Sequence, residues 1–318
     1  MKALATQFNR KSTSEQVTEG LDLRGKVALV TGANSGLGFE SMRVLALRGA
    51  HVIGAARTVD KAREACSLVQ GQTTPIACEL SDLSAVAVCA DTVHKMGCSI
   101  DILMCNAGIM ALPKLQQKGG LELQFLTNHL GHFLLINRLL ECVTAADQGR
   151  VVLLSSGGHT LSVSGGVDMD NLSGEKGYNA WKFYGQSKLA NILTSKELSR
   201  RLQGTRATSN AVHPGVIRTN LMRSTQGPLS SLISALAKPF ERTVQQGAAT
   251  QCYVAAHPDV SAVSGQYFAD CREKEPSRDA CRDELASQLW RVSEQLVADR
   301  LTSGRAQPLP ILTKKFMR

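Results

Sequence analysis

The chain has few aromatic residues and no long apolar stretch. Aromatic side chains make up 4% of its 318 residues, and no basic stripe carries interleaved aromatics. The formal charge of +9 is spread along the sequence, so we expect a solvated basic surface and no nucleic-acid partner. No run approaches the ~20 apolar residues of a membrane span, and residues 1–20 are too polar for a signal peptide. These absences predict a cytoplasmic protein with no transmembrane segment.

Paired metal-ligand motifs are also absent. The nine cysteines are an odd number without a C-x-x-C pair, which argues against a disulfide framework and against a zinc site. His129 and His132 lie on one predicted helix, but no carboxylate or cysteine stands at ligand spacing. We expect these histidines to pack or cap, and we expect no metal.

What the chain does contain is a regular alternation of apolar strands and helices. Strands that are apolar on both faces are typical of a parallel sheet covered by helices on both sides. We therefore predict an α/β fold with a doubly wound parallel sheet, in one domain over residues 21–300. A loose N-terminal arm (1–20) precedes it, and a basic tail (301–318) follows. The predicted strands cover residues 26–30, 51–57, 75–80, 100–105, 150–156, 207–212 and 265–268.

Several connections carry weaker signals. Residues 12–15 suggest a cap for a short helix, and Ser81 suggests a cap for the helix that runs to about Met96. One long helix is predicted over 123–140, a glycine-rich loop over 157–177, and a helix over 181–198. An amphipathic helix is predicted over 283–298.

Residues 31–38 place a glycine-rich loop between the first strand and a helix. Glycines allow a tight turn and a close backbone approach, and the helix N-terminus offers amide donors to a pyrophosphate. The spacing is G-x-x-x-G-x-G, and no Gly-Lys-Ser/Thr follows, so a triphosphate loop is disfavoured. A glycine-rich turn without a ligand is the alternative, but the flanking strand and helix favour a dinucleotide site.

Tyr184 and Lys188 stand four residues apart on the helix predicted over 181–198. They therefore share one helix face. A fixed ammonium lowers the pKa of a nearby phenol, which would suit Tyr184 to general acid-base work. The alternative, a surface helix with an aromatic residue and a lysine, is common for such a pair in isolation.

Together these motifs resemble the short-chain dehydrogenase/reductase family over roughly residues 12–298. The motifs are the loop 31–38, Asn106-Ala-Gly108, Ser156, Tyr184-x-x-x-Lys188 and Pro214-Gly215. The sequence is most similar to a branch that contains retinol dehydrogenases and WW-domain oxidoreductases. Segments 128–133, 213–219 and 267–271, Leu289-Trp290 and the long interval from Ser156 to Tyr184 carry that likeness.

The resemblance implies a role for each catalytic position. Tyr184 would exchange a proton with the substrate oxygen, and Lys188 would bind the nicotinamide ribose and depress the tyrosine pKa. Ser156 would hydrogen-bond the substrate oxygen, and Asn128 would hold a water in the proton relay. The implied cofactor contacts are Gly32, Asn34, Ser35, Gly36, Leu37, Gly38, Arg57, Glu79, Leu80, Asn106, Ala107, Gly108, Tyr184, Lys188, Pro214, Gly215, Val216 and Thr219.

The end of the second strand predicts NADP(H) as the cofactor. An NAD site places a carboxylate there, whereas this chain has Ala56 and Arg57, which leave room and a positive charge for a 2′-phosphate. The alternative is that Arg57 is a solvated loop residue while Glu79 or Asp60 serves an NAD ribose. Two features depart from the family pattern: Glu79 replaces the usual Asp, and the apolar anchor of membrane-bound members is missing.

The expected partner is a small apolar substrate, a ketone, aldehyde or alcohol. Residues 221–240 carry seven large apolar side chains and include two proline breaks, which suits a lid over a cleft. A plain surface helix is nearly as good an interpretation of them. Two other functions stay open, a non-catalytic nucleotide-binding regulator and a reductase of a conjugated ring, and a homo-oligomer is left open as well.

Overall fold

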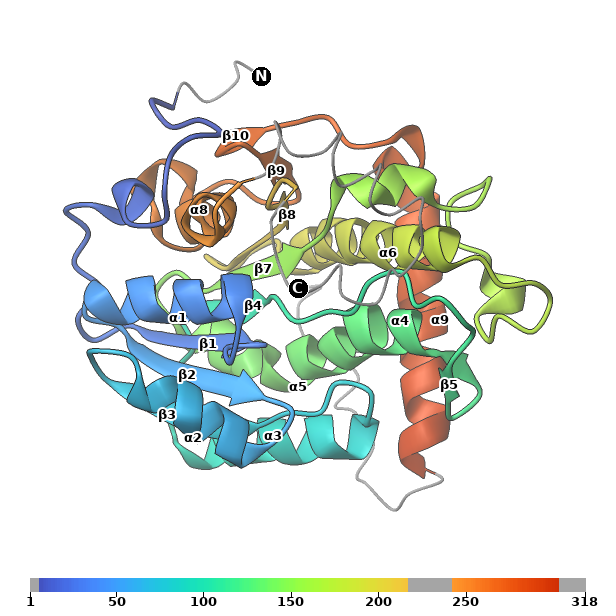
Figure 1. Ribbon diagram of the computed structural model, residues 1–318, viewed down its shortest axis with the longest axis horizontal. Helices are drawn as coiled ribbons and strands as arrows, with labels where there is room; N and C mark the ends of the chain where they lie inside the picture. The colour runs from blue at the N-terminus through green and yellow to red at the C-terminus, as the bar shows by residue number, and fades with distance from the viewer. Residues whose placement is uncertain (1–5, 217–241, 303–318) are drawn as a thin grey trace.

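The computed structural model describes residues 6–216 and 242–302 of the chain. An eight-stranded sheet forms its centre, in the order β10-β9-β8-β7-β4-β1-β2-β3 (Figure 1). All pairings are parallel except that of β10 with β9. The strands are β1 (Val27–Thr31), β2 (His51–Ala56), β3 (Thr73–Ala77), β4 (Ile102–Cys105), β7 (Arg150–Leu154), β8 (Thr208–His213), β9 (Tyr267–Ala269) and β10 (Arg272–Glu273). The predicted doubly wound fold is confirmed.

Helices cover the two faces of this sheet. Because side chains alternate across a strand, Leu29 of β1 joins one core while Ala28 and Val30 join the other. The core that contains Val30 is closed by α1 (Gly36–Leu47), α2 (Val59–Ser67) and α8 (Val244–Ala256). The core that contains Leu29 is closed by α3 (Leu83–Lys95), α5 (Gly131–Ala145), α6 (Ala180–Arg201) and α9 (Asp283–Thr302).

The order of the strands fixes where a ligand can bind. The chain runs outward from β1 to β2 and β3, and then returns to the other side of β1 with β4. Ligands of doubly wound sheets bind at the carboxyl ends of the strands, at such a switch point. The loops after β1, β4, β7 and β8 are therefore the segments that can build a site.

Several predicted connections differ from the structure. The helix predicted over 123–140 is interrupted: α4 (Leu123–Phe125) leads into the π-helical turn η2 (Leu126–Leu130) and then into α5. The loop 157–177 contains the short helices η3 (Gly157–Leu161) and η4 (Met169–Asn171). An unpredicted hairpin joins β5 (Gln117–Lys118) to β6 (Leu121–Glu122). The remaining short helices are η1 (Gln16–Thr18), η7 (Pro258–Val260) and η8 (Arg278–Cys281).

The cap predicted for α3 was wrong by one residue. Asp82, not Ser81, accepts hydrogen bonds from the backbone N–H groups of Ser84 (3.1 Å) and Ala85 (3.2 Å). The Ser81 hydroxyl instead donates to Glu79 Oε1 at 2.9 Å. A carboxylate is a stronger acceptor than a hydroxyl for the first amides of a helix, which explains the outcome.

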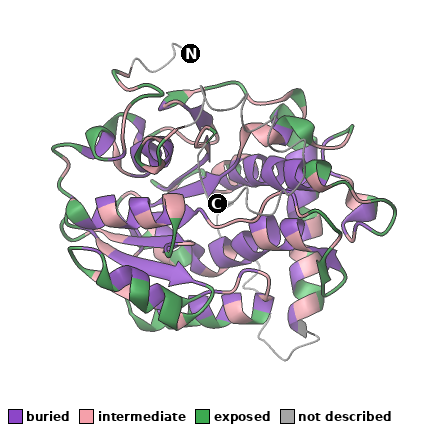
Figure 2. Ribbon diagram, in the orientation of Figure 1, coloured by how far each residue is buried: buried purple, intermediate pink, exposed green. Residues whose placement is uncertain are grey.

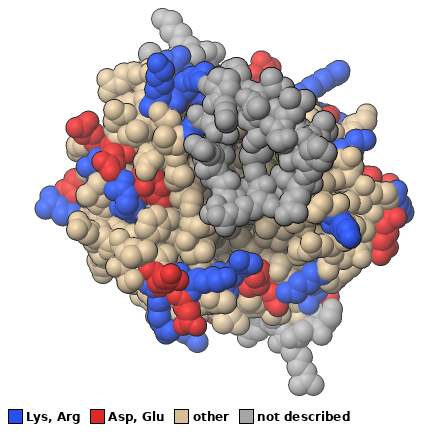
Figure 3. All heavy atoms as spheres, in the orientation of Figure 1, with Lys and Arg blue, Asp and Glu red and all other residues tan. Residues whose placement is uncertain are grey.

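Charged side chains of both signs alternate over the visible face of the molecule (Figure 3). The described Lys and Arg residues on this face do not gather into one large patch. This arrangement agrees with the interpretation of the positive excess as a solvated surface.

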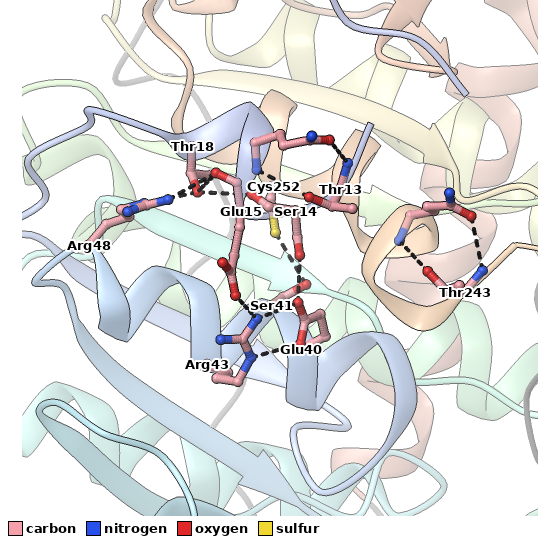
Figure 4. Close-up of polar contacts among 12 residues, drawn as sticks. Thr13, Ser14, Glu15, Thr18, Glu40, Ser41, Arg43, Arg48, Thr243 and Cys252 are labelled. Carbon is pink, nitrogen blue, oxygen red and sulfur yellow. Dashed lines mark hydrogen bonds and ion pairs between the residues drawn. The ribbon is translucent and has the colours of Figure 1, made fainter. Parts of the chain in front are cut away.

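The described part of the N-terminal arm is packed, and the expectation of a loose arm was wrong for it. Ser14 is fully buried, and its hydroxyl donates to Glu40 of α1 at 2.6 Å (Figure 4). The Ser14 backbone N–H donates to the Gln245 carbonyl of α8 at 2.9 Å. Val17 is also fully buried, and Arg43 of α1 pairs with both Glu15 and Glu40. The arm therefore ties α1 to α8.

Helix α6 is buried along most of its length (Figure 2). Helix α9 packs against it and crosses its direction in the view of Figure 1. Trp290 of α9 is fully buried, with its ring edge-on to Phe133 at 4.8 Å between centroids and under the Arg201 guanidinium at 4.3 Å. Helix α6, which carries Tyr184 and Lys188, is thus held by the sheet and by α9.

Among the helices of residues 6–216 and 242–302, none has the length and apolar character of a membrane span.

Candidate active site

The glycine loop between β1 and α1 has the geometry of a phosphate cradle. Gly32 (φ +67°) and Gly36 (φ +54°) adopt left-handed conformations. A Cβ on Gly38 would lie 2.3 Å from the Gly32 carbonyl oxygen, so only glycine fits there. The Ser35 side chain makes no capping bond, which leaves the first amides of α1 free for an anion. The residues present fit a dinucleotide pyrophosphate.

Thr31, at the end of β1, holds the loop that follows β4. Its hydroxyl accepts from the backbone N–H groups of Asn106 (2.9 Å) and Ala107 (3.0 Å), and it contacts His132 Nε2 at 2.8 Å. The Asn106 side chain donates to the Thr31 carbonyl at 2.9 Å. The structure therefore brings the predicted segment 106–108 to the side of the glycine loop.

Gln251 of α8 is a supporting residue that the sequence did not indicate. This buried amide donates to the Ser41 hydroxyl of α1 at 2.6 Å and to Asn106 Oδ1 at 3.2 Å. It joins α8, α1 and the end of β4 directly behind the cradle. Because the residue lies more than 140 positions from Asn106 in the chain, no local pattern points to it.

Asn128 lies in the π-helical turn η2 and fastens the loop after β4. Its amide oxygen accepts from the Ile109 backbone N–H at 2.8 Å, and its amide nitrogen donates to the Ile109 carbonyl and the Ser187 hydroxyl, each at 2.9 Å. The side chain thus links this loop to α6. The predicted water of a proton relay stays a prediction.

Ser156 and Tyr184 meet at the end of β7. The Ser156 hydroxyl accepts from the Gly158 backbone N–H at 3.1 Å, and it acts on Tyr184 as a polar neighbour that lowers the pKa of the phenol. Gly185 makes this approach possible, because a Cβ there would lie 2.7 Å from the Ser162 nitrogen and 2.8 Å from the Gly158 carbonyl oxygen. The turn after β7 can therefore rest directly on α6.

Lys188 is buried on the same face of α6. Its ammonium donates to the Leu154 carbonyl at the end of β7 (3.0 Å) and lies 5.8 Å from the centre of the Tyr184 ring. A Cβ on Gly108 would lie 3.3 Å from Lys188 Nζ and 3.0 Å from Asn128 Oδ1, so glycine keeps the approach to both atoms open. Burial lowers the pKa of Lys188 to about 8.

Burial, and not Lys188, decides the direction of the pKa shift of Tyr184 in this structure, and the pKa-lowering role of Lys188 stays a prediction. Burial raises the pKa of Tyr184 above its ordinary value of 10, and the neighbouring Ser156 hydroxyl opposes that rise. The physical reason is that removing a phenolate from water costs more than a single hydroxyl donor returns. Lys188 directs its ammonium to Leu154 rather than to the phenol.

The two histidines of the interrupted helix pack, as predicted. His129 contacts the Ser293 hydroxyl at 2.8 Å, and His132 contacts Thr31 and the Asn128 carbonyl. Burial lowers the pKa of His129 to about 3 and that of His132 to about 4, so both rings are neutral at pH 7. Within residues 6–216 and 242–302, no three His, Cys, Asp or Glu side chains gather in a metal-binding group.

The side chains expected around the adenosine lie at the ends of β2 and β3. Arg57 is exposed at the end of β2 and makes no ion pair with another described residue. Asp60 pairs with Arg63 at 3.0 Å, and Glu79 Oε1 accepts from the Ser81 backbone N–H at 3.0 Å. Leu80 is buried, and its backbone packs against Gly131 at the start of α5.

The loop after β8 is held by Arg242. The Arg242 guanidinium donates to the Pro214 carbonyl at 3.4 Å and pairs with Asp270, and its backbone N–H donates to the Val216 carbonyl at 2.9 Å. Gly215 lies against the same guanidinium. Thr219, and the apolar segment 221–240 proposed as a lid, lie outside the described residues.

Fold and site together define a class, the dehydrogenases that bind a nicotinamide dinucleotide on a doubly wound sheet. The model of the short chain dehydrogenase family matches residues 26–228, and the chain belongs to this family. The predicted family is thus confirmed, as is the predicted likeness to one of its branches.

Named relatives show the same likeness over nearly the whole chain. The short-chain dehydrogenase TIC 32 B, chloroplastic, of Brassica napus is 41% identical over 93% of this chain and 96% of its own length. The human WW domain-containing oxidoreductase is 39% identical over 93% of this chain and 74% of its own. Mouse retinol dehydrogenase 14 is 38% identical over 86% of each.

A solved structure has the same fold. The crystal structure of an uncharacterized protein from Mycobacterium Paratuberculosis superposes with a TM-score of 0.72 and 32% identity. The match covers 88% of this chain and 96% of that one.

Proposed function

We propose that the protein transfers a hydride between NADP(H) and an apolar ketone or aldehyde, or the corresponding alcohol. One observation carries this proposal. The buried Tyr184, with the Ser156 hydroxyl as a polar neighbour, shares a helix face with the buried Lys188 beside the glycine cradle. This set provides an acid, an oxygen-binding donor and a cation at one point, as hydride transfer to a carbonyl requires.

Each side chain has a defined part in that reaction. The bound dinucleotide supplies or accepts the hydride. In reduction, the Tyr184 hydroxyl gives its proton to the substrate oxygen, and in oxidation the phenolate takes that proton back. The Ser156 hydroxyl donates to the same oxygen and stabilises the charge that develops on it. Lys188 would hold the nicotinamide ribose, and Gly108 carries no Cβ, which would lie 3.3 Å from the Lys188 ammonium nitrogen.

The end of β2 supports NADP(H). Ala56 offers a small buried side chain, and the exposed Arg57 has no ion-pair partner among the described residues. The alternative carboxylates are engaged: Asp60 by Arg63, and Glu79 by Ser81. A free guanidinium can form charge-assisted, bidentate bonds with a phosphate.

Cofactor preference tests this assignment. Hydrogen bonds to charged groups contribute roughly 1.5–3 kcal/mol, so we expect kcat/KM to favour NADPH over NADH about ten- to a hundredfold. Ala56→Asp combined with Arg57→Ala should move the preference toward NADH. Arg206→Ala, which removes an exposed charge beside β8 and leaves Asp60 paired, is the control and should leave the ratio unchanged. Equal kcat/KM values in the wild type would end the assignment of Arg57.

The approach to Tyr184 supports an apolar substrate. The exposed Trp181 ring stands edge-on to the Tyr184 ring at 6.3 Å between centroids. Leu161, on the turn that rests on Gly185, and Val216, after β8, are exposed apolar side chains as well. Exposed apolar groups beside a buried polar centre suit a ligand with one oxygen on an apolar body.

A panel of ketones, aldehydes and alcohols assayed with both cofactors is the direct experiment. We expect turnover in the dark of medium to large apolar ketones, such as aromatic or isoprenoid ones. Small charged substrates should be poor. No turnover of any member, with dinucleotide binding intact, would favour the non-catalytic regulator. Turnover of conjugated rings alone would favour the ring reductase.

We also propose a reducing, cytoplasmic location. All nine cysteines are free thiols, and most of them are buried. The TIC 32 relatives are chloroplastic by name, so a fluorescent fusion of the full chain should be imaged against cytosolic and plastid markers. A fusion confined to an organelle would contradict the proposal.

A further inference from the structure

Two histidines contact the turn that carries Ser156. His159 Nδ1 lies 2.7 Å from the Ser156 carbonyl oxygen, and the Gly157 backbone N–H donates to His213 Nδ1 at 3.0 Å. The carbonyl and the N–H of the single peptide group between Ser156 and Gly157 are thus each bound by an imidazole. Neither histidine was among the residues that the sequence indicated for the site.

The contacts define the protonation state of both rings. A carbonyl oxygen can only accept, so His159 Nδ1 donates, and its Nε2 accepts from the Ser277 backbone N–H at 2.9 Å. His213 Nδ1 accepts, so it carries no proton. Burial lowers the pKa of both rings, that of His213 to about 4. Both histidines are therefore neutral at working pH.

His213 also lies where β8 ends and the loop to Pro214 and Gly215 begins. It is the last residue of β8 and directly precedes Pro214 and Gly215, the expected nicotinamide side of the cofactor site. A Cβ on Gly157 would lie 3.4 Å from His213 Nε2, so the ring lies flush against the turn. The titratable groups that act on it electrostatically are Arg242, Asp270, His159 and Lys274.

We propose that His213 is a positioning residue that sets the Ser156 hydroxyl against the substrate oxygen, through its hydrogen bond from Gly157. The inference rests on the proposed role of Ser156. The Ser156 hydroxyl is held by the Gly158 N–H, and Gly158 follows directly on the residue that His213 binds. A shift of that turn moves the hydroxyl, and a misplacement of about 1 Å at a reacting centre costs on the order of 10²-fold in rate.

The test compares variants that keep or remove the acceptor. In His213→Asn the amide oxygen can replace Nδ1 as acceptor, whereas His213→Leu and His213→Phe cannot accept a hydrogen bond. We expect both apolar variants to lower kcat roughly 10- to 100-fold, with the Kd for NADPH changed less than about threefold. His213→Asn should restore kcat to within about threefold of wild type. The second apolar variant guards against a folding defect in the first, and the melting temperature is measured for all.

A double-mutant cycle with Ser156→Ala separates a positioning role from a structural one. If His213 acts through Ser156, then His213→Leu in the Ser156→Ala background should lower kcat by less than about threefold further. The proposal is overturned if the kcat losses of the two single variants multiply in the double variant. It is also overturned if His213→Asn is as slow as His213→Leu, or if the variants lose only affinity for NADPH. Wild-type turnover by Ser156→Ala alone would instead sink the proposed role of Ser156, whatever the His213 variants do.

Discussion

At the scale of single residues, burial and the neighbouring polar groups decide the protonation state of Tyr184. Burial raises the pKa of Tyr184, the Ser156 hydroxyl works against that rise, and the Lys188 ammonium points to Leu154. A phenol with a raised pKa holds its proton at neutral pH. The protein alone therefore presents Tyr184 as an acid, which is the form that carbonyl reduction uses.

The first prediction concerns this hydroxyl. Tyr184→Phe should keep the fold and the affinity for the dinucleotide but lower kcat roughly 10²- to 10⁴-fold, because general acid-base catalysis is lost. Steady-state assays measure kcat, a thermal melt checks the fold, and a dinucleotide titration measures the affinity. Tyr253→Phe is the matched control: Tyr253 lies on α8, where it packs against Phe8 of the N-terminal arm away from the site, and this variant should keep kcat. A Tyr184→Phe enzyme with more than about a tenth of wild-type kcat would remove Tyr184 as the acid.

Short-range patterns predicted the residues that the structure gathers around the glycine loop and Tyr184, whereas their supports come from distant parts of the chain. The spacing of Tyr184 and Lys188 on one helix is visible in the sequence. The contacts of Gln251 with Asn106 and of His213 with Gly157 are not, because each joins residues that only the fold brings together. The direction of the pKa shift of Tyr184 was not visible in the sequence either, since burial is a tertiary property.

At the scale of elements, helix ends show how this fold satisfies backbone groups. Arg150, the first residue of β7, is buried without a carboxylate partner among the described residues. Its guanidinium donates to the His257 carbonyl at 2.8 Å and the Val254 carbonyl at 3.4 Å, at the C-terminus of α8. A cation there also meets the negative end of the helix dipole. Burial lowers the pKa of Arg150 to about 10, so it stays charged at neutral pH.

Arg150→Met should therefore lower the free energy of unfolding by about 1–3 kcal/mol, since buried carbonyls lose a charged donor. The control is Arg206→Met nearby, whose exposed pair with Asp147 (3.1 Å) should contribute less than about 1 kcal/mol. Urea unfolding of both variants measures the difference. Equal losses would mean that Arg150 does not cap α8.

The N-terminal arm offers a second test at this scale. Ser14→Ala leaves the buried Glu40 carboxylate without one of its donors, and should cost roughly 1.5–3 kcal/mol of stability. Ser12→Ala, farther out on the same arm, is the control and should change stability by less than about 0.5 kcal/mol. A Ser14 variant as stable as wild type would show that the arm does not hold α1.

The elements themselves were predictable to differing degrees. Strands that are apolar on both faces, such as β1 and β4, are marked by composition alone. The π-helical turn that carries Asn128 was read as continuous helix, because one extra residue in a turn leaves the apolar periodicity nearly unchanged. The arm was read as loose because it is polar, yet its Ser14 and Thr18 are buried through hydrogen bonds.

At the scale of the whole molecule, polar groups join the two cores across the sheet. His132 lies on α5, on one side, and binds Thr31 at the end of β1, while Gln251 of α8 reaches Asn106 from the other side. These contacts converge where β1 and β4 part, at the switch point that builds the site. Stability and active-site geometry therefore depend on the same neutral side chains.

This dependence predicts a defined loss of stability in acid. The folded-state pKa values of His129 and His132 are about 3 and about 4, below the ordinary value of 6.5, because burial disfavours the charged rings. As pH falls below 6.5 the unfolded chain takes up protons that the folded chain does not, so the free energy of unfolding decreases until the folded-state values are reached. Each ring should account for about 2 kcal/mol between pH 7 and pH 5. His132→Gln, which keeps a polar side chain toward Thr31, should flatten this dependence in urea unfolding at the two pH values. His94→Gln, at an exposed position of α3, is the matched control and should leave it as steep as in wild type. If His132→Gln loses as much unfolding free energy between pH 7 and pH 5 as the wild type does, His132 does not contribute to the acid-induced loss of stability.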